Sequence, residues 1–175
     1  MRTLFLVFTM SFLFLSGCTE FPTDDIAIDT AADKKVDFKG YKSYDWLAAA
    51  GILHDPEENW EPPGFNADAE IMFLVDRELR ERKMTETSDN PDFLVAYVLG
   101  IDMAALKLKE DPETKIYDIE YIPKGALLLI LIDPGSMRAI WIGKATAQPD
   151  KELDMDTRKK RLDHIITKML KQLPG

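Results

Sequence analysis

The sequence predicts an α+β domain, a two-layer sandwich in which a mostly antiparallel sheet of about four to five strands carries two amphipathic helices on one face. Two observations predict this fold. Apolar residues recur at spacings of three and four in residues 66–83 and 162–173, which is the period of a helix with one buried stripe. Short apolar or alternating runs bounded by Pro, Gly and Asp lie before and between these segments, as strands and turns do. Both helices must bury their stripes, and one face of a sheet can cover both.

The first helix is expected to begin at Asn66, a good N-cap residue, with Asp68 and Glu70 in the first turn, where carboxylates favour the positive helix end. The second helix is expected to end before Pro174. Residues 148–156, which precede it, are polar and predict a link. The apolar stripe of the first helix contains Ile71, Leu74, Val75 and Leu79, and that of the second contains Leu162, Ile165, Ile166, Met169, Leu170 and Leu173.

The strand pattern occurs in five runs, at residues 41–47, 92–99, 117–121, 126–132 and 139–142. In the first run, Tyr44 and Trp46 share one face, which either packs in the core, the commoner role, or forms an aromatic binding platform. The second run is apolar almost throughout, as a strand buried on both faces is. The charged residues 106–112 predict a loop.

A hairpin is the clearest local prediction. Asp133-Pro134-Gly135-Ser136 is a strong turn signal, and it joins the most apolar run after the N-terminal segment to a second apolar run. The stretch 48–66, by contrast, contains three prolines and predicts a long loop. Trp60 lies within that loop, where it either caps the core or lines a ligand site.

Residues 1–17 have the layout of a secretory signal: Arg2 near the start, an apolar run of about a dozen residues, and two small residues. The run is too short for a membrane-spanning helix, which needs about twenty residues. The sequence Leu-Ser-Gly-Cys at residues 15–18 resembles a bacterial lipobox, and this resemblance implies cleavage before Cys18 and a diacylglyceryl group on its sulfur. The alternative is an ordinary secreted protein with an incidental cysteine. The lipobox is favoured because the chain's single cysteine occupies the position that the motif requires.

The lipobox implies two or three acyl chains at Cys18, diacylglycerol and an N-acyl chain such as palmitate, and hence a stable membrane anchor. Thr19 follows, where an Asp would suggest retention at the inner membrane, so the expected location is the outer membrane, facing the periplasm, if the source has one. Residues 18–32 contain few large apolar side chains and predict a lipidated, flexible tether. A single α+β domain is then expected at residues 33–175.

Composition restricts the possible partners. Without the signal the chain has about 158 residues, which fits one domain, and it keeps 21 basic against 31 acidic side chains, a net charge of about −10. Such a surface repels nucleic acid, which is therefore not expected as a partner. With Cys18 acylated, no thiol remains for a disulfide or a Cys-ligated metal.

Several short motifs follow one another in a fixed order along the chain. They are the lipobox, Val36-Asp37-Phe38, residues 41–46 (YKSYDW), residues 91–97 (PDFLVAY), residues 124–133, residues 141–145 (WIGKA) and the final helix. Taken together, these motifs resemble a family of bacterial lipoproteins known as domain of unknown function 4136. The sequence departs from the family in lacking a glycine near Met84-Thr85 and in its longer, more charged middle. The resemblance implies a periplasm-facing lipoprotein with an α+β domain and supplies no catalytic residues.

The residues do not form a recognisable catalytic or metal-binding motif. The two histidines, His54 and His164, have no zinc-ligand spacing. The serines considered as nucleophiles, Ser43, Ser88 and Ser136, do not lie in a Gly-x-Ser-x-Gly sequence. The acids considered for a glycosidase pair lie in a charged, exposed-looking segment; they are Asp111, Glu113, Asp118 and Glu120. The acids considered for calcium lack the loop spacing of an EF-hand; they are Asp89, Asp92 and the pair Asp24-Asp25.

The sequence therefore predicts a noncatalytic interaction module, not an enzyme, without a cofactor beyond the covalent lipid. Its expected partners are the membrane, through the anchor, and another envelope protein or a cell-wall component. One alternative is a carrier of a small apolar ligand, lined by Trp60, Met72 and Met84. Another is an enzyme that cleaves cell-wall glycan with paired carboxylates.

Overall fold

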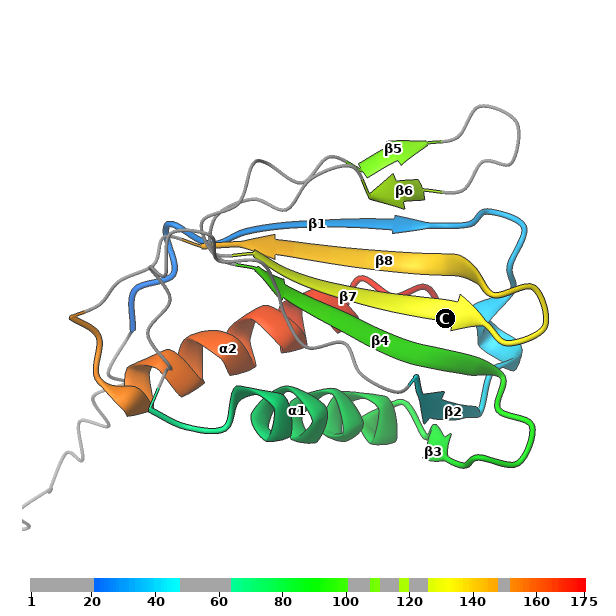
Figure 1. The fold of residues 1–175 in the computed structure, drawn as a ribbon, viewed down its shortest axis with the longest axis horizontal. Helices are drawn as coiled ribbons and strands as arrows, with labels where there is room; N and C mark the ends of the chain where they lie inside the picture. The colour runs from blue at the N-terminus through cyan, green and yellow to red at the C-terminus, as the bar shows by residue number, and fades with distance from the viewer. Residues whose placement is uncertain (1–20, 48–63, 101–107, 111–116, 120–125, 148–151) are drawn as a thin grey trace, which may run out of the picture.

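The structure, a computed structural model, describes residues 21–47, 64–100, 108–110, 117–119, 126–147 and 152–175. These residues form a six-stranded sheet with two helices, α1 and α2, and a separate two-stranded hairpin (Figure 1). The order of strands in the main sheet is β1-β8-β7-β4-β2-β3. The main-sheet strands are β1 (Ala27–Ala32), β2 (Ser43–Trp46), β3 (Thr85–Glu86), β4 (Phe93–Gly100), β7 (Ala126–Asp133) and β8 (Arg138–Thr146).

The predicted α+β class is confirmed, but the sheet is mixed, with six strands in place of the four to five mostly antiparallel strands expected. Strands β1, β8, β7 and β4 pair antiparallel, whereas β2 pairs parallel with both β3 and β4. The parallel pairing of β2 with β3 arises because α1 (Ala67–Glu81) connects the two strands and returns the chain to the end of the sheet at which β2 began. Periodicity identifies a strand but not its neighbours.

Strand β1 corrects the predicted tether. Residues 27–32 are not a flexible tether, because they pair along their whole length with β8, from Ala27 opposite Thr146 to Ala32 opposite Trp141. The strand was missed because Ile28 is its only large side chain. Small residues are sufficient to form this strand for two reasons. Helix α2 packs across β1 and β8. The pairing also satisfies backbone groups that an open edge of β8 would expose.

The predicted hairpin is confirmed as β7 and β8, which pair in register from Ala126 opposite Thr146 to Leu131 opposite Trp141, with a register shift after Leu131. A second hairpin pairs β5 (Leu108–Glu110) with β6 (Tyr117–Ile119). β6 lies within the run expected as a strand, whereas β5 lies within the expected loop. The expected loop at residues 48–66 falls largely outside the described residues.

Both helices begin at a side-chain cap; the cap of α1 was predicted, whereas that of α2 lies within residues 148–156, where a polar link was expected. The side chain of Asn66 accepts a hydrogen bond from the Ala69 backbone N–H at 3.1 Å, and the Asp154 side chain accepts one from Thr157 at 2.9 Å. Helix α2 (Met155–Leu170) begins well before the apolar stripe that predicted it, because its first two turns are mostly polar. After α1, Lys83 adopts the left-handed conformation, with φ of 65°. A residue in this conformation, usually glycine, often follows the end of a helix.

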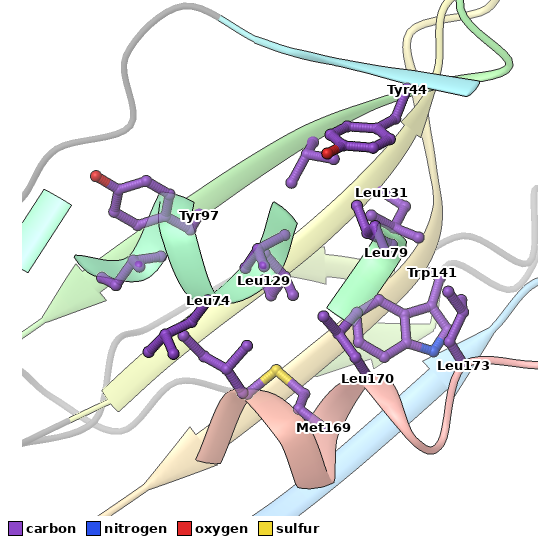
Figure 2. Packing of buried hydrophobic residues seen from close by; sticks show 14 of the residues in the cluster. Tyr44, Leu74, Leu79, Tyr97, Leu129, Leu131, Trp141, Met169, Leu170 and Leu173 are labelled. Carbon is purple, nitrogen blue, oxygen red and sulfur yellow. The ribbon is translucent and has the colours of Figure 1, made fainter. Parts of the chain in front are cut away.

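The main core lies between the two helices and one face of the sheet, as predicted. Figure 2 shows Leu74 and Leu79 of α1 and Met169 and Leu170 of α2 directed toward the sheet residues Leu129, Leu131 and Trp141. Trp141 is only 1% exposed. Such burial of large apolar side chains provides most of the driving force for folding.

The opposite face of the sheet is apolar as well. Leu128 and Ile142 are each 2% exposed and form a second cluster with Val98, Ile130 and Ala139. Strand β4 contributes Phe93 and Val95 to the main core, while its Ala96, which points to the other face, is also buried. The prediction that this strand is buried on both faces is confirmed for these residues.

Candidate functional site

The N-terminal segment is held on α2 by a buried arginine. Arg161, 7% exposed, donates from Nη1 to Asp25 Oδ1 at 2.9 Å and from Nη2 to Asp25 Oδ2 at 2.6 Å. Its Nη1 also donates to the backbone carbonyl of Pro22. Two parallel charge-assisted hydrogen bonds are the strongest geometry available to an Arg–carboxylate pair. We call Arg161, Asp25 and the Pro22 carbonyl the N-terminal clamp.

A ring contact continues the clamp toward the N-terminus. The edge of one ring meets the face of the other where Phe21 packs on His164 of α2, with ring centroids 5.9 Å apart at an interplanar angle of 84°. Burial, together with the nearby positive charges of Lys168 and Arg161, lowers the pKa of His164 below its ordinary value of 6.5. The imidazole is therefore mostly neutral at pH 7. Phe21, the first described residue, comes three positions after Cys18.

Sequence reasoning missed the clamp, although a signal for it exists. Arg161 lies four residues before Ile165 and therefore on the apolar stripe of the helix. A charge on a buried stripe requires a charged partner. The partner, Asp25, belongs to a segment whose acidic composition suggested a solvated tether, so its role was not visible from composition.

Carboxylates also join α1 to strands β2 and β4 of the sheet. Asp76 Oδ1 accepts hydrogen bonds from the Tyr44 hydroxyl at 2.9 Å and from Trp46 Nε1 at 3.0 Å. Asp68 Oδ1 accepts one from the Tyr97 hydroxyl at 2.6 Å. Burial and these hydrogen bonds raise the pKa of both tyrosines, which keeps the phenols protonated. Tyr44 is buried, so the core role predicted for it is confirmed.

A polar cluster joins the two helices. Arg77 Nη2 lies 2.6 Å from Glu78 Oε1 and 2.5 Å from Asp163 Oδ1, and Thr167 Oγ1 donates to the same Glu78 oxygen at 2.7 Å. The hydrogen bond from Arg77 lowers the pKa of Asp163. Two acids lie close together here, but the shared guanidinium keeps Asp163 ionised, and a general acid requires a raised pKa.

Three other aspartates cap backbone. Asp92 Oδ2 accepts from the backbone N–H groups of Lys42 and Ser43 at 2.8 and 2.9 Å and from the Ser43 hydroxyl at 2.9 Å. Asp133 accepts from the backbone and hydroxyl of Ser136, and Asp154 caps α2. Hydrogen bonds lower the pKa of all three carboxyl groups. Each carboxylate therefore already holds structural partners.

The candidates from the sequence fall in different places. Met84 is 6% exposed and belongs to the main core, whereas Met72 is 37% exposed on α1. The two side chains thus lie in different environments. Of the calcium candidates, Asp25 and Asp92 already bind Arg161 and the β2 backbone. Within the described residues, His, Cys, Asp and Glu do not gather in groups of three that could hold a metal ion. The candidates outside the described side chains are Cys18, His54, Trp60, Asp111, Glu113, Asp118 and Glu120.

The fold and the clamp define an α+β domain whose N-terminal segment is bound to its C-terminal helix. The chain belongs to the DUF4136 family, a domain of unknown function, whose model matches residues 28–175. No curated protein matches the sequence. Within the described ranges, none of the helices is long and apolar enough to cross a membrane.

Solved structures resemble this fold at low identity. A DUF4136 family protein from Bacteroides thetaiotaomicron is 9% identical, with 83% of this chain and 96% of that chain covered and a TM-score of 0.57. The PelC dodecamer from Paraburkholderia phytofirmans is 12% identical, with 83% and 94% covered and a TM-score of 0.48. A minor lipoprotein from Acinetobacter baumannii is 10% identical, with 76% and 87% covered and a TM-score of 0.28. At 9% identity, the likeness to the Bacteroides thetaiotaomicron protein concerns the fold alone.

Proposed function

We propose that this protein is an envelope lipoprotein whose domain acts as a noncatalytic binding module facing the periplasm. Cys18 carries diacylglycerol and an N-acyl chain, and the outer membrane is the expected site because Thr19, not Asp, follows. The observation that carries the proposal is the position of the single cysteine, at the end of a lipobox and three residues before the chain packs on α2. An anchor at this position reaches the domain almost directly.

The noncatalytic part of the proposal is supported by the roles of the described acids. Asp92, Asp133 and Asp154 cap backbone, and Asp163 pairs with Arg77, all with lowered pKa values. A glycosidase that works through paired carboxylates needs one carboxyl group with a raised pKa. The domain is instead proposed to recognise another envelope protein or a cell-wall component.

The anchor is tested by Cys18→Ala in the native host. Acyl chains contribute about 0.8 kcal/mol per buried CH₂, so the unmodified protein should move from the membrane fraction to the soluble periplasmic fraction. Thr19→Ala, which keeps the cysteine, is the matched control and should stay with the membrane. A Cys18→Ala protein that remained in the membrane fraction would contradict the anchor.

Recognition is tested by crosslinking and pull-down from intact envelopes, with the purified domain incubated separately with cell-wall polymer. We expect a reproducible envelope partner and no turnover of the polymer. Turnover that a single Asp→Asn or Glu→Gln change abolished would replace the binding module with a glycan-cleaving enzyme.

A further inference from the structure

We propose that the face of α2 that carries Lys160, Lys168 and Lys171 lies against anionic phospholipid headgroups of the membrane that holds Cys18. We call these residues the lysine stripe. The inference rests on the proposed anchor and adds to it the orientation of the domain and the lipid chemistry that the domain contacts.

The link between Cys18 and the folded domain is short. Phe21 packs on His164, and Cys18 precedes it by three residues. Three residues span at most about 11 Å when fully extended. Within the tether expected from composition, the fourteen residues 19–32 would have reached about 45 Å when fully extended. The bilayer surface therefore cannot be far from the part of α2 that Phe21 touches.

The spacing of the lysines places them on one side of α2. Lys160, His164 and Lys168 are four residues apart, and Lys171 follows three residues later, so all four side chains leave the helix on one side. All three lysines are exposed. From Lys160 to Lys171 the stripe is about 16 Å long at 1.5 Å per residue. His164, which Phe21 contacts, lies within it, so the first described residue of the chain meets α2 in the middle of the stripe.

The lysine stripe is a basic surface on an acidic chain. The chain has a net charge of −9, yet the three lysines of the stripe make no ion pair with another described residue. Their neighbours differ, since Lys159 pairs with Glu70 at 3.1 Å and Arg161 with Asp25. Lys168, in the last turn, also suits the helix dipole, but Lys160 is near the positive end and gains nothing from it. Asp156, one turn before Lys160, bounds the stripe.

An anionic bilayer surface fits these three facts. Basic side chains next to a lipid anchor are attracted to acidic headgroups, and the attraction falls off within a Debye length of about 8 to 10 Å. The short link to Cys18 keeps the stripe near that range. With α2 toward the membrane, the sheet face that carries Leu128 and Ile142 points away from it, because both helices cover the other face (Figure 1).

The experiment uses the native acylated protein, purified in detergent and reconstituted into vesicles. Since Cys18 is the only cysteine and its sulfur would be acylated, a single introduced cysteine takes one fluorophore. The two reporters are Lys160→Cys on the stripe and Met137→Cys in the turn between β7 and β8, where Met137 is 58% exposed. Lipids with a headgroup spin label quench only a nearby fluorophore. The vesicles are phosphatidylcholine with or without phosphatidylglycerol.

We expect stronger quenching at position 160 than at position 137, an increase with phosphatidylglycerol, and a decrease at high salt. Adding Lys168→Glu and Lys171→Glu should lower the equilibrium constant for contact between the stripe and the membrane about fivefold or more for each lysine changed. The control pair Lys34→Glu and Lys35→Glu, which changes net charge equally outside the stripe, should not. Intact mass confirms acylation of every sample.

The outcomes separate the two proposals. Two results with acylated protein would overturn the orientation and leave the anchor unaffected. One is equal quenching at both positions. The other is quenching at position 160 that does not change with phosphatidylglycerol or in the stripe variants. Native protein whose intact mass lacked acyl chains would overturn the anchor, and with it the inference that rests on the anchor.

Discussion

Arg161 and Asp25, 136 positions apart in the sequence, form a bidentate ion pair that joins the start of the domain to its last helix. The arginine side chain is 9% exposed and the aspartate 23%. Because the pair is largely removed from water, each charge depends on the other.

Breaking this pair should destabilise the domain strongly. Asp25→Asn leaves a buried guanidinium without its counter-charge, and removing one partner of a buried pair costs about 3 to 5 kcal/mol. Arg161→Met should cost a similar amount. We expect urea unfolding to show both losses, and the double variant to be less damaged than their sum. A loss below about 0.5 kcal/mol for either variant, the range of ordinary surface changes, would show that the clamp is not a structural element.

Gly143 should not tolerate a side chain. A Cβ atom there would lie 2.4 Å from Met169 Cγ and 2.5 Å from Trp141 Cη2, so Gly143→Ala forces the core to shift. Overpacking of this kind costs about 1 to 3 kcal/mol. Gly40→Ala is the matched control, since a Cβ there meets nothing within 4 Å. Equal midpoints for the two variants in thermal unfolding would contradict the close packing of α2 on β8.

The buried, unpaired Nε1 of Trp141 should lower the free energy of unfolding, and two substitutions of Trp141 test this. Its Nε1 is buried and has no hydrogen-bond partner among the described residues, and an unpaired buried donor costs about 1 to 3 kcal/mol. Trp141→Ala should destabilise by about 3 to 5 kcal/mol. Trp141→Phe removes the unpaired donor along with part of the ring, so its loss should be much smaller. Equal losses for both variants in denaturant titration would argue against this interpretation.

His164 should produce a pH dependence of stability. Its pKa is lowered in the folded protein, so the unfolded chain binds the proton more tightly. Stability is then complete above the ordinary pKa of 6.5 and is lost as the pH falls through the folded value. NMR titration should place the midpoint below 6.5, and His164→Gln should remove this part of the pH dependence. A midpoint above 6.5 in the protein without membranes would contradict the packing of Phe21 on a partly buried imidazole.

The sequence predicts much of this fold wherever local chemistry determines the outcome. Asn66 predicts the start of α1, and the turn at Pro134-Gly135 predicts the hairpin. It does not predict β1, whose small residues carry little apolar signal, or the parallel pairs of β2, which depend on how α1 crosses the sheet. The site divides in the same way. Cys18 stands in a recognisable motif, whereas the clamp depends on contact between distant segments.

The proposed function depends on a mature chain that begins at an acylated Cys18, next to the folded domain. Intact-mass spectrometry of the protein extracted from its native membrane measures this directly, followed by fragmentation of the N-terminal peptide. We expect a chain of residues 18–175 with diacylglycerol and an N-acyl group on Cys18. A free thiol at Cys18, or a mature chain that begins at another residue, would contradict it.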